Sequence, residues 1–89
     1  MATVRIQEVT SPGCTMCAAA KKMLEEEIKP LYPDIEIEYI EWTEPEGIEM
    51  IQNFGIMIMP GIIVNGELLS FGGLTKSDLI KKIESIRSS

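Results

Sequence analysis

The sequence predicts an α/β fold, a four-stranded mixed sheet in the order β-α-β-α-β-β-α with three helices on both faces of the sheet. Strand-like and helix-like segments alternate from the start of the chain. The first two strands flank a helix and should therefore be parallel, through a right-handed crossover. Asn65-Gly66 lies between two β-rich segments and is typical of an antiparallel hairpin. With 89 residues, the chain is expected to form a single domain, 1–89.

Apolar residues with short polar interruptions predict a first strand over about residues 3–9. The turn-rich loop 10–13 then leads into a segment of strong helix formers, residues 14–29. Pro30 and Pro33 are expected to end this helix. Its apolar positions recur at helical spacing and should pack on the sheet: Ala20, Met23, Leu24 and Ile28.

Residues 35–39 alternate strictly between apolar and acidic side chains, which predicts a half-buried edge strand. A second helix should follow, with Thr43 as its cap, Pro45 in the first turn and Glu46 completing a capping box. Gly55 is expected to end that helix. Its inward-facing residues should be Ile48, Ile51 and Phe54.

The β-branched run 62–64 predicts a strand that is buried on both faces. Residues 67–71 should return antiparallel after the hairpin, and Gly72-Gly73 should form a second turn. A capping box over residues 75–78 then opens a last helix that reaches about Arg87. The apolar stripe of this helix consists of Leu79, Ile80, Ile83 and Ile86.

The chain carries 14 acidic and 8 basic residues, for a net charge of −6. This balance argues against nucleic acid and anionic membranes as partners, because both attract basic surfaces. The longest apolar run, residues 54–64, is interrupted by glycine and proline and is too short to span a bilayer. The N-terminus shows no secretory signal. We therefore expect a soluble, cytoplasmic protein.

The cysteines give the strongest functional signal. Cys14 and Cys17 are three residues apart in a chain that has no other cysteine and no histidine. At the start of a helix, Cys14 would meet the positive end of the helix dipole, which stabilises the nucleophilic thiolate. Cys17 would lie one turn deeper and could attack a mixed disulfide on Cys14. In a reducing compartment, this pair indicates catalytic thiol–disulfide exchange.

The cysteine pair allows other interpretations. A static disulfide across so short a loop would stabilise the fold little. A closed zinc site needs four ligands, which this chain cannot supply, so no metal and no cofactor are predicted. Two alternatives remain: a non-enzymatic carrier of metal or metalloid on the two thiols, and a redox-responsive binding module. The heavy-metal-binding domains normally show Met-x-Cys-x-x-Cys, and Pro12 stands at that methionine position.

The order of elements, with these cysteines at the start of the first helix, resembles the thioredoxin fold over about residues 3–86. The likeness is greatest to the small glutaredoxin-like thioredoxins of archaea and bacteria. It implies a thiol–disulfide oxidoreductase that reduces disulfides in proteins, with Cys14 and Cys17 as catalytic residues. Four local features carry the resemblance: Cys14-x-x-Cys17, Met59-Pro60, the Asn65-Gly66 hairpin and Gly72-Gly73.

The resemblance also implies residues that contact substrate. Pro60 corresponds to the family's cis-proline, although residues alone would favour a trans bond. The backbone of Met59 would pair with the substrate. Thr15 would donate a hydrogen bond to the Cys14 sulfur or serve only as a helix-start residue. Met16, Met57 and Met59 should lie together, as an apolar rim for polypeptide substrates in preference to a Cu(I) site.

The electron donor is either a thioredoxin-reductase-type protein or glutathione. Gly72 and Gly73 match the glutaredoxin pair that helps to hold glutathione, but they also suit a turn that needs small residues. Ser11 stands where glutaredoxins often have a lysine, and Asp78 comes later after the glycines than the glutaredoxin acid does. Together with the negative charge, these departures favour the reductase.

Two further residues, Glu8 and Trp42, could bear on the active site. Thioredoxin has a buried carboxylate six residues before its first cysteine, and Glu8 stands at that position. Its parity with Val4 and Ile6 would allow it to point inward, but we expect a strand-end glutamate that reaches solvent, because unpaired glutamates are almost never fully buried. Trp42, the one tryptophan, is expected to pack away from the active site.

Overall fold

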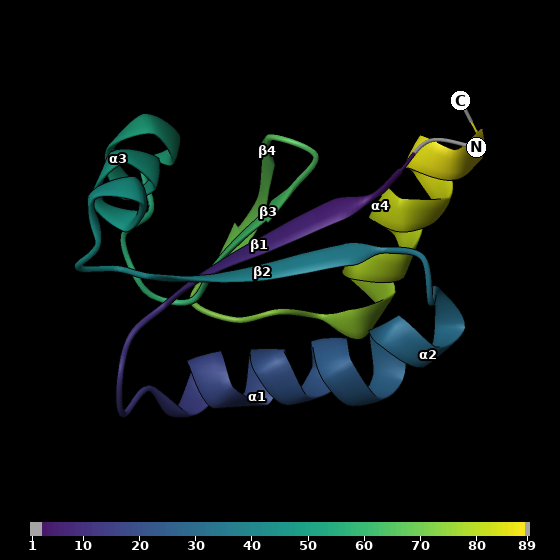
Figure 1. The fold of residues 1–89 in the computed structure, drawn as a ribbon, viewed down its shortest axis with the longest axis horizontal. Helices are drawn as coiled ribbons and strands as arrows, with labels where there is room; N and C mark the ends of the chain where they lie inside the picture. Colours follow the sequence, from purple (N-terminus) through teal and green to yellow (C-terminus); the bar gives the residue numbers. More distant parts are fainter. Residues whose placement is uncertain (1–2, 89) are drawn as a thin grey trace.

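The computed structural model describes residues 3–88 and shows one mixed sheet with strand order β2-β1-β3-β4 (Figure 1). The central strand β1 pairs in parallel with β2 and antiparallel with β3, and β4 returns antiparallel to β3. The predicted topology is confirmed, with β2 at an edge. The bounds of the strands are β1 Arg5–Thr10, β2 Glu36–Glu41, β3 Gly61–Val64 and β4 Glu67–Phe71.

The first helical segment runs through Pro30 instead of ending there. A proline has no N–H to donate, and its ring would meet a carbonyl of the preceding turn in a regular α-helix. The helix widens into a π turn before the proline, where the amide of Lys29 bonds to the carbonyl of Leu24. The segment ends at Leu31. It has three parts: α1 (Thr15–Met23), η1 (Leu24–Ile28) and α2 (Lys29–Leu31).

The second helix, α3 (Pro45–Phe54), has Glu44 as its N-cap residue. The sequence prediction of Thr43 as the cap was wrong. A proline pushes the residue before it into an extended conformation, and Glu44 has φ −73° and ψ 153°. Pro45 therefore takes the first helical position, where its missing N–H costs nothing. Gly55 ends α3 in the left-handed region, with φ 67°, as predicted.

The helices cover both faces of the sheet. In Figure 1, α1 lies on one side of the strands and α3 on the other. The last helix, α4 (Lys76–Ser88), shares the core of the α1 face. The buried residues of that core are Val4, Ile6, Ala20, Leu24, Ile28, Ile35, Ile62, Val64, Leu79 and Ile83. Those of the smaller α3 core are Val9, Ile40, Met50, Ile56 and Ile63.

The inward face of α3 differs from the prediction. Ile48 is 46% exposed, while Gly47 and Met50 are buried. A Cβ on Gly47 would lie 2.1 Å from the carbonyl oxygen of Glu41, so the helix backbone packs directly on the end of β2. Met50 follows one turn later on the same face. Ile51 and Phe54 also pack against this core, but only partly buried, so two of the three predicted contacts are kept.

The hairpin between β3 and β4 forms as predicted. Asn65 and Gly66 have φ angles of 48° and 79°, the positive values that a type I′ turn requires. The Asn65 side chain also accepts a 2.7 Å hydrogen bond from the Arg5 amide and donates one to the Thr3 carbonyl. The turn is thereby fastened to the start of the central strand.

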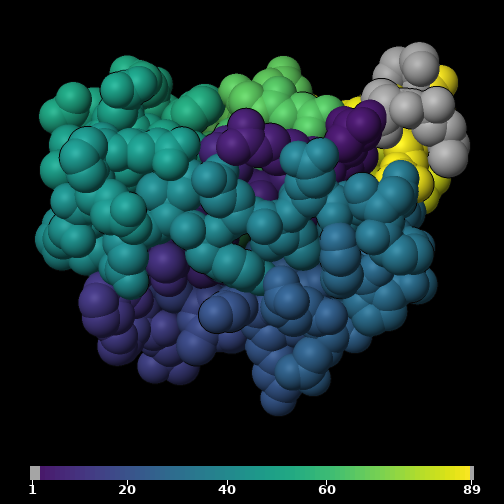
Figure 2. All heavy atoms as spheres, in the orientation of Figure 1, coloured from purple at the N-terminus to yellow at the C-terminus, as the bar shows by residue number. Residues whose placement is uncertain are grey.

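The edge position of β2 can be followed on the surface. In Figure 2 the atoms of the β2 region lie at the front of the molecule, and only a few atoms of β1 are visible. None of the helices within residues 3–88 combines the length and apolar character needed to cross a bilayer.

Candidate active site

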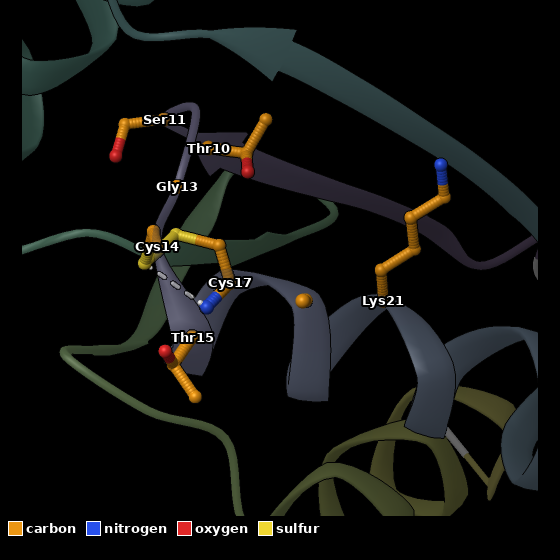
Figure 3. A pocket seen from close by; sticks show the side chains of 8 residues that line it. Thr10, Ser11, Gly13, Cys14, Thr15, Cys17 and Lys21 are labelled. Atoms are coloured by element: carbon orange, nitrogen blue, oxygen red, sulfur yellow. Dashed lines mark hydrogen bonds between the residues drawn. A yellow bond between two sulfur atoms is a disulfide. The ribbon is translucent and has the colours of Figure 1, made fainter.

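The two cysteines lie where the loop after β1 enters α1 (Figure 3). They form a disulfide, with their Cα atoms 5.2 Å apart. Cys14 is the N-cap residue of α1 and is partly exposed, whereas Cys17 lies in the first turn and is only 2% exposed. The predicted placement, an outer and an inner sulfur at the start of a helix, is confirmed.

The start of α1 directs a backbone donor at the outer sulfur. The amide of Cys17 donates a 3.1 Å hydrogen bond to the Cys14 sulfur. The first N–H groups of a helix have no partner within the helix, and they carry the positive end of its dipole. Thr15, predicted as a possible donor to this sulfur, is the exposed first residue of α1. The chemistry that follows is stabilisation of a thiolate on Cys14 once the disulfide is reduced.

Met59 and Pro60 lie beside the cysteines. The Cys14 sulfur is 3.9 Å from the carbonyl oxygen of Met59. The Met59–Pro60 peptide bond is cis, as the family resemblance implied. Pro60 is buried, and its carbonyl accepts a 2.9 Å hydrogen bond from the amide of Gly72. This bond joins the Gly72-Gly73 turn to the site, while pairing of the Met59 backbone with substrate stays a prediction.

The apolar surface beside Cys14 is made differently from the predicted methionine rim. Met16 is half exposed, and its methyl carbon would lie 3.3 Å from a Cβ on Gly73. Ile58 is 62% exposed, and its side chain would lie 3.8 Å from a Cβ on the neighbouring Gly72. Met59 instead packs its side chain against the α3 core. The exposed apolar side chains at the glycine turn therefore include Met16 and Ile58, together with Phe71, which directly precedes Gly72.

Glu8 is completely buried, so our expectation of a solvent-reaching glutamate was wrong. Its strand is the central one, and Glu8 is opposite Tyr39 on one side and Ile62 on the other. Burial raises the pKa of Glu8 from 4.5 to about 7, against a smaller lowering by Lys21. Within residues 3–88, neither carboxyl oxygen has a hydrogen-bond partner. The parity of Glu8 on β1 was the sequence signal for this burial.

A pocket of about 430 Å³ opens between the active-site loop and α1. Figure 3 shows the disulfide and Lys21 at separate points of its wall, with Lys21 extending from α1 toward the strands. The ammonium of Lys21 lies 5.0 Å from the centre of the Tyr39 ring. The Tyr39 hydroxyl donates a 2.6 Å hydrogen bond to Glu25. The pocket is lined by Thr10, Ser11, Gly13, Cys14, Thr15, Cys17, Ala18 and Lys21.

Sequence reasoning missed Lys21 and Tyr39, and it misplaced Trp42. The amide of Trp42 donates a 2.8 Å hydrogen bond to the carbonyl of Thr10, which lines the pocket. Trp42 is thus one strand away from the active-site loop and 44% exposed, instead of packed at a distance. The signal was available, because parallel strands bring their carboxyl ends to the same edge of a sheet.

The two sulfurs of Cys14 and Cys17 can undergo thiol–disulfide exchange. Among residues 3–88, no cluster of three or more histidine, cysteine, aspartate or glutamate side chains is arranged to hold a metal ion. The groups available for chemistry here include the two sulfurs, the N-terminus of α1, a buried carboxyl on the face that α1 covers, and the Lys21 ammonium.

Comparison with known proteins gives consistent matches along the chain. Residues 4–85 match the family described as "Thioredoxin domain". A thioredoxin of Methanocaldococcus jannaschii is 36% identical over 84 residues, covering 94% of this chain and 96% of the relative. A thioredoxin of Methanothermobacter thermautotrophicus is 32% identical over 78 residues, covering 88% and 95%. Among solved structures, a thioredoxin from Nicotiana alata superposes with a TM-score of 0.72 at 20% identity, covering 97% of this chain and 75% of that one.

Proposed function

The chain belongs to the thioredoxin family and is a thiol–disulfide oxidoreductase, and from this premise we propose that it reduces disulfides in other proteins, with Cys14 as the attacking thiolate and Cys17 as the resolving thiol. One observation carries this assignment of roles. The partly exposed sulfur accepts the hydrogen bond of the helix N-terminus, and the other sulfur is buried one turn inside.

The reaction proceeds in two exchanges. The Cys14 thiolate attacks one sulfur of a substrate disulfide, which forms a mixed disulfide and releases the other substrate sulfur as a thiolate that takes up a proton. Cys17 then loses its proton and attacks the Cys14 sulfur. This step closes the Cys14–Cys17 disulfide and releases the second substrate thiol. The substrate gains two electrons and two protons, and the structure corresponds to the oxidised enzyme.

The buried position of Cys17 requires a proton acceptor inside the protein. Glu8 lies on the face of β1 that α1 covers, together with Val4 and Ile6. With a pKa of about 7, its carboxyl group can both accept and release a proton near neutral pH. We assign to Glu8 the acceptance of the Cys17 proton during the resolving step.

A polypeptide substrate would dock on the surface that surrounds Cys14. The Met59 carbonyl, 3.9 Å from the Cys14 sulfur, offers a backbone partner to an extended segment. Met16 and Ile58 add exposed apolar area at the Gly72-Gly73 turn. An extended segment held by backbone pairing and apolar contacts can vary widely in sequence, which suits a general reductant of proteins.

We assign regeneration of the dithiol to a thioredoxin-reductase-type donor. Met16 reaches over Gly73, on the surface where a glutaredoxin would hold glutathione. Ser11 offers no positive charge to the tripeptide, and the net charge of −6 repels it. Each lost charged contact to a carboxylate removes about 1.5–3 kcal/mol of binding. Both curated relatives described above are also thioredoxins.

Reduction of insulin disulfides tests the function and the donor together. The protein is assayed once with NADPH and a thioredoxin reductase, and once with NADPH, glutathione and glutathione reductase. We expect turnover with the first system to exceed turnover with the second, and the Cys14→Ser variant to be inactive with both. Faster turnover with glutathione would overturn the assignment of the donor. No turnover with either system, together with stoichiometric binding of Cu(I) or Zn(II), would favour a metal carrier instead.

A further inference from the structure

Glu8 has an unusual environment for a carboxyl group. The side chain is completely buried, and neither of its oxygens has a hydrogen-bond partner within residues 3–88. Buried polar groups without a partner are uncommon in folded proteins, because their desolvation is not compensated. If this carboxyl group is to act as a base, a nearby positive charge must therefore lower the free-energy cost of ionising it.

One basic side chain lies in a position to do this. Lys21 follows Cys17 by four residues, so the two side chains lie on the same face of α1, and both line the active-site pocket. The ammonium of Lys21 lies over the Tyr39 ring, and Tyr39 is the residue opposite Glu8 in the pairing of β1 with β2. Glu25 in turn holds the Tyr39 hydroxyl. Lys21 is thus held between the pocket and the strand position beside Glu8.

We propose that Lys21 is a positioning residue of the resolving step: its ammonium, seated on Tyr39 at the edge of the active-site pocket, favours the charged carboxylate of Glu8 and so prepares it to accept the Cys17 proton. This inference rests on the proposed function, in which Glu8 is that acceptor. In this role Lys21 acts on the reaction only through Glu8.

The other groups that face Glu8 do not supply this charge. Tyr39 is a neutral phenol, because burial and the hydrogen bond from its hydroxyl to Glu25 raise its pKa. The β3 residue opposite Glu8 is the apolar Ile62. On α1, Cys17 is uncharged until it gives up its proton. Burial raises the pKa of Glu8, and Lys21 is the group whose charge opposes that rise.

The chain provides a matched control for the test. Lys21 and Lys22 are adjacent, exposed and equally charged, but only Lys21 lines the pocket and faces Tyr39. Lys21→Met and Lys22→Met remove the same charge from neighbouring positions and change the net charge equally. Lys21→Arg keeps the charge and provides a rescue variant.

The direct measurement is the titration of the Glu8 carboxyl carbon by NMR in the reduced protein. We expect its midpoint to rise by up to about one pH unit in Lys21→Met, and to stay at the wild-type value in Lys22→Met and Lys21→Arg. The expected shift in the midpoint is no larger than this, because Lys21 is exposed and solvent screens its charge. An unmoved midpoint in Lys21→Met would overturn the role of Lys21.

A kinetic measurement links the charge to the reaction. The pH profile of insulin reduction should shift to higher pH in Lys21→Met, and this shift should vanish when Glu8 is replaced by Gln. A shift of equal size in the Glu8→Gln background would show that Lys21 does not act through Glu8. Absence of insulin reduction by the wild-type protein would overturn the proposed function and this inference together, whereas normal reduction with an unmoved Glu8 midpoint would overturn the inference alone.

Discussion

The amide nitrogen of Cys17 lies 3.1 Å from the sulfur of Cys14, the N-cap residue of helix α1. One backbone donor thus links the two cysteines in addition to their disulfide. It belongs to the buried residue and acts on the partly exposed one. The same short segment gives the two sulfurs different surroundings: a helix N-terminus open to substrate for Cys14, and the protein interior for Cys17.

This difference predicts unequal reactivity in the reduced protein. Cys14 should react first with a limiting amount of iodoacetamide at neutral pH, because its thiolate is stabilised and accessible. Peptide mapping by mass spectrometry identifies the labelled residue. Preferential labelling of Cys17 would reverse the assigned roles.

Glu8 should make stability depend on pH. Its pKa rises from 4.5 to about 7 in the folded protein, so the folded state keeps a proton that the unfolded chain has already lost in this range. The stabilisation is therefore complete below pH 4.5 and is lost as the pH rises through 7. The full rise in pKa corresponds to about 3 kcal/mol.

The comparison with Glu8→Gln isolates this effect. Urea unfolding of the oxidised proteins at about pH 4.5 and pH 8 should show wild type losing more unfolding free energy than the variant over that interval. Equal losses in the two proteins would show that Glu8 ionises in the fold as easily as in the unfolded chain.

Local sequence signals were enough for the topology and for the reactive pair. The hairpin at Asn65-Gly66, the end of α3 at Gly55 and the helix start at Cys14 each depend on conformational preferences of a few neighbouring residues. The family resemblance added the cis bond before Pro60, which residue preferences alone would not have favoured.

What the sequence did not show depends on contacts between distant segments. Parity placed Glu8 on the inward face of its strand, but its burial depends on α1 covering the end of that strand. The meeting of Lys21 with Tyr39 depends on strand register and helix placement, which spacing along the chain does not reveal. Trp42 was misplaced for the same reason, since its neighbour Thr10 belongs to another strand.

Met16 should limit the use of glutathione. Replacing Met16 by Ala removes the side chain that reaches over Gly73 and uncovers the glycine turn. We expect the rate with glutathione, divided by the rate with thioredoxin reductase, to rise several-fold. Met57→Ala is the matched control, because Met57 is 80% exposed and contributes to neither core. An equal ratio in Met16→Ala and Met57→Ala would mean that Met16 does not decide the donor.

Gly47 should be required for the packing of α3. A Cβ at this position would lie 2.1 Å from the Glu41 carbonyl oxygen, so Gly47→Ala must push α3 away from β2. Such overpacking costs about 1–3 kcal/mol, which urea unfolding can measure. Gln52→Ala, at an exposed position of the same helix, should change stability little. Wild-type stability of Gly47→Ala would contradict the close contact.

The assignment of Cys14 as the attacking and Cys17 as the resolving cysteine is tested most directly by trapping the mixed disulfide. Reduced Cys17→Ser and Cys14→Ser variants are each mixed with a disulfide-containing protein, and the covalent complexes are separated without reductant and identified by mass spectrometry. We expect a stable complex through Cys14 in the Cys17→Ser variant and little or none in Cys14→Ser, because attack begins at the partly exposed cysteine. Trapping of Cys14→Ser through Cys17, at a rate equal to that of Cys17→Ser, would show that attack does not begin at Cys14.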